Sequence, residues 1–189
     1  LKLKKMGKKV IFDAHEDLPM QLLGKPYLSK PIKLVLSKFV GLCERIALPK
    51  FDAIVCATPF ILDKMLSINP NSVDINNYPV LDEFTCSNDW DNKKNEVAYI
   101  GSISKIRGVG EVVSALGYTR GVRLNLAGKF SQASFETEVK DFEAWVDVNE
   151  LGFLSREEIT VTLADSKAGL VTLHPVINYL DSLPVKMFE

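Results

Sequence analysis

Residues 96–116 read EVAYIGSISKIRGVGEVVSAL, and this stretch decides the fold class. It begins with the apolar strand pattern EVAYIGS (96–102), continues through a turn with two cations, and ends in a helical pattern from Gly108 to Leu116. The next apolar run, VRLNLAG (122–128), supplies a second strand. Strands that alternate with helices form parallel sheets covered by helices, so the stretch predicts an α/β protein.

The same alternation extends over most of the chain. Further strands are expected at 8–14, 52–58, 72–79, 151–154 and 168–174. Further helices are expected at 30–47, 59–67 and 132–147, after Ser155, and from Asp181–Ser182. The helix at 30–47 carries an apolar stripe made of Ile32, Val35, Phe39, Cys43 and Ile46.

Residues 80–95 separate two such groups, because they have no periodicity and are rich in Asp, Asn and Lys. We therefore expect parts of two Rossmann-like parallel-sheet domains, 1–79 and 96–189, joined by an interdomain linker at 80–95. Neither domain begins with a GxGxxG turn, so no dinucleotide cofactor is expected. The sequence has no DxD, HExxH or CxxC motif, so no metal site is expected either.

Composition and charge narrow the function classes. The 189 residues are 47% hydrophobic and 25% charged, with a net charge of −1, which is typical of globular proteins and gives no reason to expect a nucleic-acid partner. The three cysteines lack metal-ligand spacing, so a reducing, cytoplasmic compartment is expected. Residues 1–50 hold eleven Lys and Arg against four Asp and Glu. This excess indicates either a solvated surface or a face toward an anionic partner, such as the inner face of a cell membrane.

Candidate site residues follow the predicted strands, because ligands of open α/β sheets bind beyond the carboxyl ends of the strands. One set follows strands of the second domain: Gly101, Ser102, Lys105, Arg107, Gly128 and Lys129. The turn 101–108 leads into a helix N-terminus, where a phosphate is favoured, although a routine turn with solvated cations remains the alternative. His15 follows the first strand and is either a catalytic or ligating residue or a structural histidine.

The last residues, DSLPVKMFE (181–189), combine a helix start with a lysine and two carboxylates. Lys186 at a helix N-terminus suits a phosphate, and the carboxylate of Glu189, one turn further on, suits a sugar diol. The alternative is a simple ion pair between these two residues on an exposed helix.

Seven segments in this order resemble the group 1 family of retaining glycosyltransferases with the GT-B fold: VIFDAHED, FDAIVCAT, NNYPVLDEF, YIGSISKIRGV, LNLAGKF, LGFLSREEI and NYLDSLPVKMFE. The resemblance is strongest to bacterial enzymes of surface-polysaccharide and lipopolysaccharide assembly. It implies transfer of a sugar from a nucleotide-diphosphate sugar to a hydroxyl of a glycan or lipid-linked glycan, with retention and without a metal or cofactor. Family members are longer, so this chain is expected to be a central piece of a longer protein, and the piece alone is expected to be inactive.

The resemblance also assigns roles in the donor site. Glu189 matches the acidic residue that holds the nucleotide ribose, and Asp181 stands where the family has the first acidic residue of its E-x7-E motif. Arg107 matches the residue that grips the diphosphate. Ser102 replaces a second arginine of many relatives, so Lys105 or Lys186 is expected to supply the missing charge.

Three further residues take roles from the resemblance. His15 matches a histidine that contacts the transferred sugar, and Phe153 and Leu154 match the loop that holds the base. Two other functions remain open: a GT-B-fold nucleotide-sugar epimerase, and a non-catalytic nucleotide-binding module, which the departures at Ser102 and Asp181 make plausible.

Overall fold

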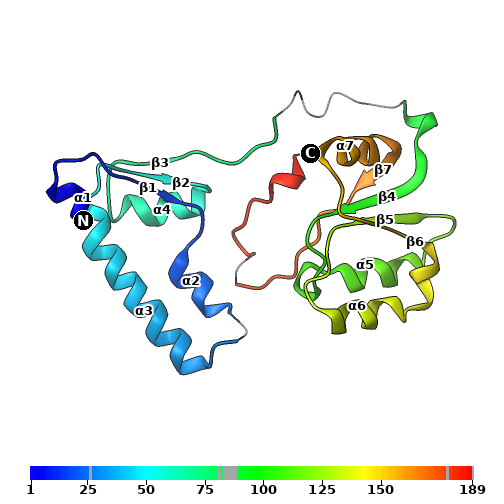
Figure 1. Cartoon of the computed structure of the whole chain (residues 1–189), viewed down its shortest axis with the longest axis horizontal. Coiled ribbons are helices and arrows are strands. Elements are labelled where there is room, and N and C mark those ends of the chain that lie inside the picture. The colour runs from blue at the N-terminus through cyan, green and yellow to red at the C-terminus, as the bar shows by residue number, and fades with distance from the viewer. Residues whose placement is uncertain (26, 81, 83–88, 178, 189) are drawn as a thin grey trace. The chain divides into compact units, whose positions relative to one another are not determined.

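The computed structural model describes residues 1–25, 27–80, 82, 89–177 and 179–188 (Figure 1). The chain divides into two compact units, one formed by Leu1–Tyr78 with Pro175–Val185 and the other by Pro79–His174 with Lys186–Glu189. The domain limits expected from the sequence differ from this division mainly in residues 175–185, which group with the first unit. Residues 81 and 83–88 of the expected linker lie outside the described residues.

The first unit contains a parallel sheet of three strands in the order β1-β2-β3. Its strands are β1 (Ile11–Ala14), β2 (Ala53–Cys56) and β3 (Ser72–Asp74), and its helices are α1 (Lys2–Lys5), α2 (Leu18–Leu23), α3 (Lys30–Ala47) and α4 (Pro59–Leu66). A small core lies between the sheet and the helices and contains Ala14, Leu48, Ile54, Cys56, Ile61 and Met65.

Local capping explains where two of these helices begin. The Asp17 side chain accepts a hydrogen bond from the backbone N–H of Met20 at the start of α2. Thr58 does the same for Ile61 at the start of α4, and Pro59 occupies the first helical position, where no N–H is needed. Because both caps directly follow a strand, α2 and α4 begin at the carboxyl edge of the sheet.

Helix α3 has the bounds expected from the sequence, but its apolar stripe faces solvent. Ile32, Val35, Phe39 and Ile46 are 49%, 66%, 61% and 51% exposed. Glu44, on the opposite side of α3, is the buried residue of the helix, at 8% exposure.

The second unit contains a parallel sheet of four strands in the order β6-β5-β4-β7. Its strands are β4 (Lys94–Ile100), β5 (Arg123–Ala127), β6 (Val148–Gly152) and β7 (Ser166–Gly169), and its helices are α5 (Val109–Leu116), α6 (Ala133–Lys140) and α7 (Arg156–Asp165). Figure 1 shows α5 and α6 on one face of this sheet and α7 on the other. The core holds Tyr99, Ile103, Val109, Val113, Leu116, Leu124, Leu126, Phe135 and Val139.

The predicted capping box at the start of α7 is present. The Ser155 hydroxyl accepts from the Glu158 N–H, and the Glu158 carboxylate accepts from the Ser155 N–H. These bonds from the backbone and side chain of Ser155 lower the pKa of Glu158. The negative charge is thereby held at the positive end of the helix dipole.

Five expected elements differ clearly from the structure, and one of them, the strand expected at 72–79, is β3, which ends at Asp74. The helix expected at 132–147 is α6 followed by a 3₁₀ segment, Glu143–Asp147. The strand expected at 151–154 is β6, which ends at Gly152, and the strand expected at 168–174 is β7, which ends at Gly169. The helix expected from Asp181 is reduced to a 3₁₀ turn, Val185–Met187.

The chain leaves the sheet after β7 because hydrogen bonds from Thr172 and His174 hold it at the turn before α5. The Thr172 hydroxyl donates to the Arg107 carbonyl at 2.7 Å. The backbone N–H of His174 donates to the Ile106 carbonyl at 3.0 Å. These bonds replace strand pairing and fix the turn that carries Arg107.

The described residues also contain no helix that is long and apolar enough to cross a membrane. The fold class expected from the sequence, α/β with parts of two Rossmann-like parallel-sheet domains, is confirmed.

Candidate functional site

A pocket of about 570 Å³ lies at the carboxyl ends of β4, β5 and β6 in the second unit. Six of the residues predicted for the donor site line it: Gly101, Ser102, Gly128, Lys129, Phe153 and Leu154. Parallel strands place their carboxyl ends on one edge, which explains why these distant residues meet. The order of the strands also reverses next to β4, because β5 and β6 lie on one side of it and β7 on the other.

Two glycines let the backbones of this edge approach each other closely. Gly101 and Gly128 have φ angles of +138° and +141°, which other residues rarely adopt. A Cβ atom at Gly128 would lie 1.8 Å from the carbonyl oxygen of Gly101. Hydrogen bonds hold both turns, from Gly101 N–H to Ala127 O at 2.9 Å and from Gly128 N–H to Gly152 O at 2.7 Å. Only glycine fits at this contact.

The loop after β6 forms an apolar wall of the pocket. Phe153 is 90% exposed, and Leu154 and Ile159 also line the pocket. An exposed aromatic ring beside a pocket offers a flat surface to a planar ligand. Phe153 and Leu154 therefore lie where a base-binding loop is expected.

The predicted cations of this unit lie in different surroundings. Arg107 is the last residue of the 3₁₀ segment Lys105–Arg107. It precedes Gly108, which has a φ of +71° and is the N-cap of α5. Lys105 is bonded to the carboxylate of Glu138 at 3.1 Å, so a neighbouring negative charge offsets its own. Lys129 lies in the pocket wall and is exposed.

Lys186 reaches the carboxyl end of β4. Its Nζ atom lies 3.3 Å from the carbonyl oxygen of Ile100 and 4.6 Å from the centre of the Tyr99 ring. The same atom is the nearest neighbour that a Cβ at Gly101 would meet, at 3.2 Å. Lys186 thus lies next to the glycine turn, while Glu189 lies outside the described residues.

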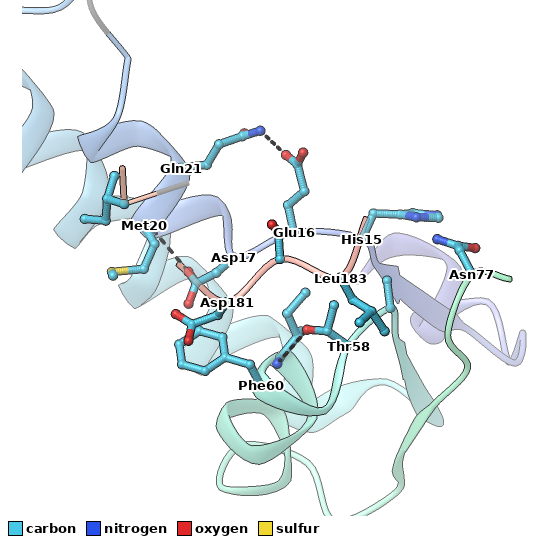
Figure 2. A pocket seen from close by; sticks show the side chains of 14 residues that line it. His15, Glu16, Asp17, Met20, Gln21, Thr58, Phe60, Asn77, Asp181 and Leu183 are labelled. Carbon is cyan, nitrogen blue, oxygen red and sulfur yellow. Dashed lines mark hydrogen bonds between the residues drawn. The ribbon is translucent and has the colours of Figure 1, made fainter. Parts of the chain in front are cut away.

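A second pocket, of about 190 Å³, lies within the first unit and is lined by both predicted catalytic residues, His15 and Asp181 (Figure 2). The Nε2 atom of His15 lies 3.0 Å from a carboxylate oxygen of Asp13. Asp181 was expected to begin a helix of the second domain, but it lies in a turn of the segment that groups with the first unit. Asp181 and Lys186 thus belong to different units, the first and the second.

Sequence reasoning missed several polar and aromatic residues that line this pocket, namely Glu16, Gln21, Phe60 and Asn77. The Glu16 carboxylate and the Gln21 amide are hydrogen-bonded to each other. Thr58 and Asn77 follow the second and third strands, so applying the strand-end rule to every strand of the first unit would have found this side of the pocket.

An ion-pair network supports the loop that carries His15. The Nζ atom of Lys64 on α4 lies 2.9 Å from Asp17 at the start of α2 and 2.9 Å from Glu44 on α3. Because Glu44 is 8% exposed, this network is mostly removed from water. It links α2, α3 and α4, and Asp17, its member at the start of α2, follows His15 by two residues.

The part of the chain that the structure describes shows no cluster of side chains that could bind a metal ion. No group of three or more His, Cys, Asp or Glu side chains there is arranged to hold a metal ion.

Solved structures share this arrangement of sheets and helices. The structure of Anabaena HepE in complex with UDP and glucose matches 90% of this chain with a TM-score of 0.63 and 14% sequence identity. WaaG, a glycosyltransferase involved in lipopolysaccharide biosynthesis, matches 91% with a TM-score of 0.57 and 11% identity. The apo form of the lipopolysaccharide outer core galactosyltransferase WaaB matches 90%, at 0.55 and 14%. The chain has the fold of GT-B glycosyltransferases.

The match covers only part of these GT-B proteins. This chain spans 48% of HepE, 45% of WaaB and 55% of WaaG, or about half their length. No protein-family model matches the sequence, and no curated protein sequence matches it. At these identities the GT-B likeness establishes the fold, and the activity has to be argued from the site.

Proposed function

We propose that the full-length protein is a glycosyltransferase that moves a sugar from a nucleotide-diphosphate sugar to a hydroxyl group of a glycan or lipid-linked glycan during surface-polysaccharide assembly. The observation that carries this proposal is the pocket at the carboxyl ends of β4, β5 and β6, where two glycine turns, an aromatic wall and a lysine occupy one edge of the sheet. The GT-B neighbours, among them one solved with UDP and glucose, support it.

The parts of the donor are assigned to the pocket and its surroundings, because Arg107 and Lys186 are not among the residues that line the pocket itself. The base would pack against Phe153 and Leu154, and the glycine turns would let the sugar and phosphates approach the backbone. The diphosphate would be held by Arg107, by the N-terminus of α5 and by Lys186. The ribose is assigned to Glu189, which is outside the described residues.

In the proposed reaction, the bond between the anomeric carbon and the diphosphate oxygen breaks, and a bond from the anomeric carbon to the acceptor oxygen forms. The diphosphate leaves with the electron pair of the broken bond, and the proton of the acceptor hydroxyl passes to an oxygen of this departing diphosphate. Cations and a helix dipole stabilise this departing charge without a metal. Retention of configuration is part of the proposal and rests on the family resemblance.

The pocket of the first unit is proposed to take the acceptor. Carboxylates and amides accept and donate hydrogen bonds to sugar hydroxyls, and Phe60 can pack against a sugar ring. Asp13 would orient the His15 imidazole, which is assigned a contact with the transferred sugar together with Asp181.

One observation favours a second candidate, a nucleotide-binding module without turnover. Ser102 has no charge and Lys105 is already bonded to Glu138, so the diphosphate site has fewer cations than the family pattern provides. Incubation with nucleotide sugars separates the candidates. A transferase releases nucleoside diphosphate when acceptor glycan is present, an epimerase changes the sugar without acceptor, and a binding module does neither.

Arg107→Ala in the full-length protein tests the donor site. Loss of one charge-assisted hydrogen-bonding group is worth about 1.5–3 kcal/mol, so binding of UDP, GDP or ADP should weaken about ten- to a hundredfold in calorimetry. Arg120→Ala is the matched control, because Arg120 is an exposed arginine of the same unit that follows the C-terminus of α5, whereas Arg107 precedes its N-terminus. Unchanged nucleotide affinity in Arg107→Ala would remove the proposed diphosphate site.

A further inference from the structure

Tyr99, a fully buried residue of β4, contacts two parts of the donor-site edge with one side chain. Its hydroxyl donates a hydrogen bond to the Ser102 carbonyl at 3.0 Å. The centre of its ring lies 4.6 Å from the Nζ atom of Lys186. Ser102 lines the pocket at the carboxyl ends of β4, β5 and β6, whereas Tyr99 does not. Tyr99 therefore lies behind the pocket and acts on it through its neighbours.

The hydroxyl of Tyr99 fixes the turn that follows β4. This turn contains Gly101, whose φ is +138° and whose N–H donates to the Ala127 carbonyl at 2.9 Å. The bond from Tyr99 adds a second attachment one residue further on, at Ser102. A buried phenolic hydroxyl needs a hydrogen-bond partner, so the core of the unit and the turn are held to each other by this bond.

The ring of Tyr99 holds the ammonium group of Lys186. A cation within about 6 Å of the centre of an aromatic ring is attracted by the negative face of the ring. The Ile100 carbonyl oxygen, 3.3 Å from the same Nζ atom, accepts a hydrogen bond from it. A ring face and a carbonyl oxygen attract an ammonium without carrying a net charge of their own. They place Lys186 beside Gly101, where a Cβ would lie 3.2 Å from its Nζ atom.

We propose that Tyr99 is a positioning residue for the donor diphosphate, because its ring holds Lys186 and its hydroxyl holds the turn at Ser102. This role rests on the proposed function, since it requires a pocket that binds a nucleotide-diphosphate sugar. A flexible lysine loses rotamer freedom when it binds a phosphate. A lysine that is already held loses less at that moment, so Tyr99 strengthens diphosphate binding without touching the donor.

The position of Lys186 is measured first, without nucleotide. Full-length protein is prepared with isotope-labelled lysine, and the ε-methylene resonance of Lys186 is identified by its absence in Lys186→Met. The ring current of Tyr99 should shift this resonance upfield of the value for an exposed lysine. The shift should persist in Tyr99→Phe, which keeps the ring and lacks only the hydroxyl.

Nucleotide binding then separates the ring from the hydroxyl. Calorimetry uses the tightest binder among UDP, GDP and ADP, together with its nucleoside. Tyr99→Phe should weaken binding of the diphosphate about two- to tenfold, because the bond to Ser102 is lost. Replacing Tyr99 by ring-fluorinated phenylalanine keeps the shape of phenylalanine but removes electron density from the ring face. It should weaken binding about three- to thirtyfold beyond Tyr99→Phe.

Two comparisons show that these effects act through Lys186. Fluorination at Tyr99 should leave nucleoside affinity unchanged, because a nucleoside has no diphosphate. In the Lys186→Met background it should change neither affinity. The matched control applies the same replacements to Tyr118, a 93% exposed tyrosine that follows the C-terminus of α5, and should change nothing.

Four results would overturn the role of Tyr99. The first is the lack of an upfield shift at Lys186, and the second is equal diphosphate binding with phenylalanine and with its fluorinated analogue. The third is an equal loss of nucleoside and diphosphate binding, which would make Tyr99 merely structural. The fourth is a parent protein that binds none of the three diphosphates. Only this last result removes the proposed function as well, so the two failures are distinguishable.

Discussion

Gly128→Ala is the substitution for which the structure makes the sharpest prediction. The new Cβ would lie 1.8 Å from the carbonyl oxygen of Gly101 and 2.8 Å from its carbonyl carbon, so backbone atoms would have to move. Neither turn can move without loss, because Gly101 donates to Ala127 and Gly128 donates to Gly152. The φ angle of +141° adds conformational strain for any residue with a side chain.

The expected magnitude follows from these two contributions. A backbone conformation that favours glycine costs about 1–3 kcal/mol for another residue. Overpacking that forces a backbone shift costs about 1–3 kcal/mol more. The free energy of unfolding of the second unit should therefore fall by about 2–6 kcal/mol. Gly121→Ala is the matched control, because its φ is also positive, at +66°, but a Cβ there meets nothing within 4 Å. It should cost only about 1–2 kcal/mol.

Urea unfolding of the full-length protein, followed by circular dichroism, measures both changes, and calorimetry with UDP measures the effect on the pocket. Gly128→Ala should lose nucleotide binding, because the two turns that form the pocket floor separate, whereas Gly121→Ala should retain it. If the two variants lose the same stability and both bind nucleotide, the close contact between the turns is not what shapes the pocket.

Two further predictions concern the first unit. His15→Ala should lower turnover far more than nucleotide affinity, because His15 is assigned to the transferred sugar; an equal loss of nucleotide binding in calorimetry would mean that it is structural. Hydrogen bonds from Lys4 and from the Val10 N–H, with a further contribution from Lys9, hold the pKa of Asp52 well below its ordinary value of 3.8. This contribution to stability is present above that value and is lost as the pH falls below it. The difference in Tm between the parent and Asp52→Asn should therefore shrink from pH 7 toward pH 3, and a constant difference, or an equal effect of Asp63→Asn, would contradict it.

The sequence predicted the elements of the fold well where one local pattern dominates. The bounds of α3 and the capping box of α7 follow from side-chain spacing alone. The closing helix was wrong because Ser182 does not act as a cap. Its hydroxyl donates to the Tyr179 carbonyl at 3.0 Å and closes the preceding turn instead. Periodicity also predicted the apolar stripe of α3. It did not predict that the stripe faces solvent, because a sequence pattern does not show which elements cover a helix.

The candidate site was predicted to different extents in the two units. Four residues of the second-unit pocket, Gly101, Ser102, Gly128 and Lys129, could be found because the strand-end rule uses topology, which the alternation of strands and helices reveals. Phe153 and Leu154 were predicted from the family resemblance. Asp181 was assigned to that unit by the family resemblance and because the second domain was expected to run without interruption from residue 96 to residue 189. The chain instead changes units twice near its end, after His174 and after Val185, and no local pattern marks these crossings.

The surroundings of the two candidate lysines bear on how the diphosphate charge would be balanced. By the resemblance to group 1 glycosyltransferases, Ser102 stands where many members have an arginine, so the proposed site needs one cation from elsewhere. Lys105 forms an ion pair with Glu138, and this ion pair would have to break before the lysine could bind a phosphate. Lys186 is held next to Gly101 by the carbonyl of Ile100 and the face of the Tyr99 ring, and its Nζ atom already lies at the strand end where phosphates settle. Lys186 already lies beside the glycine turn, whereas Lys105 faces Glu138, and we assign Lys186 the second positive charge of the proposed donor site.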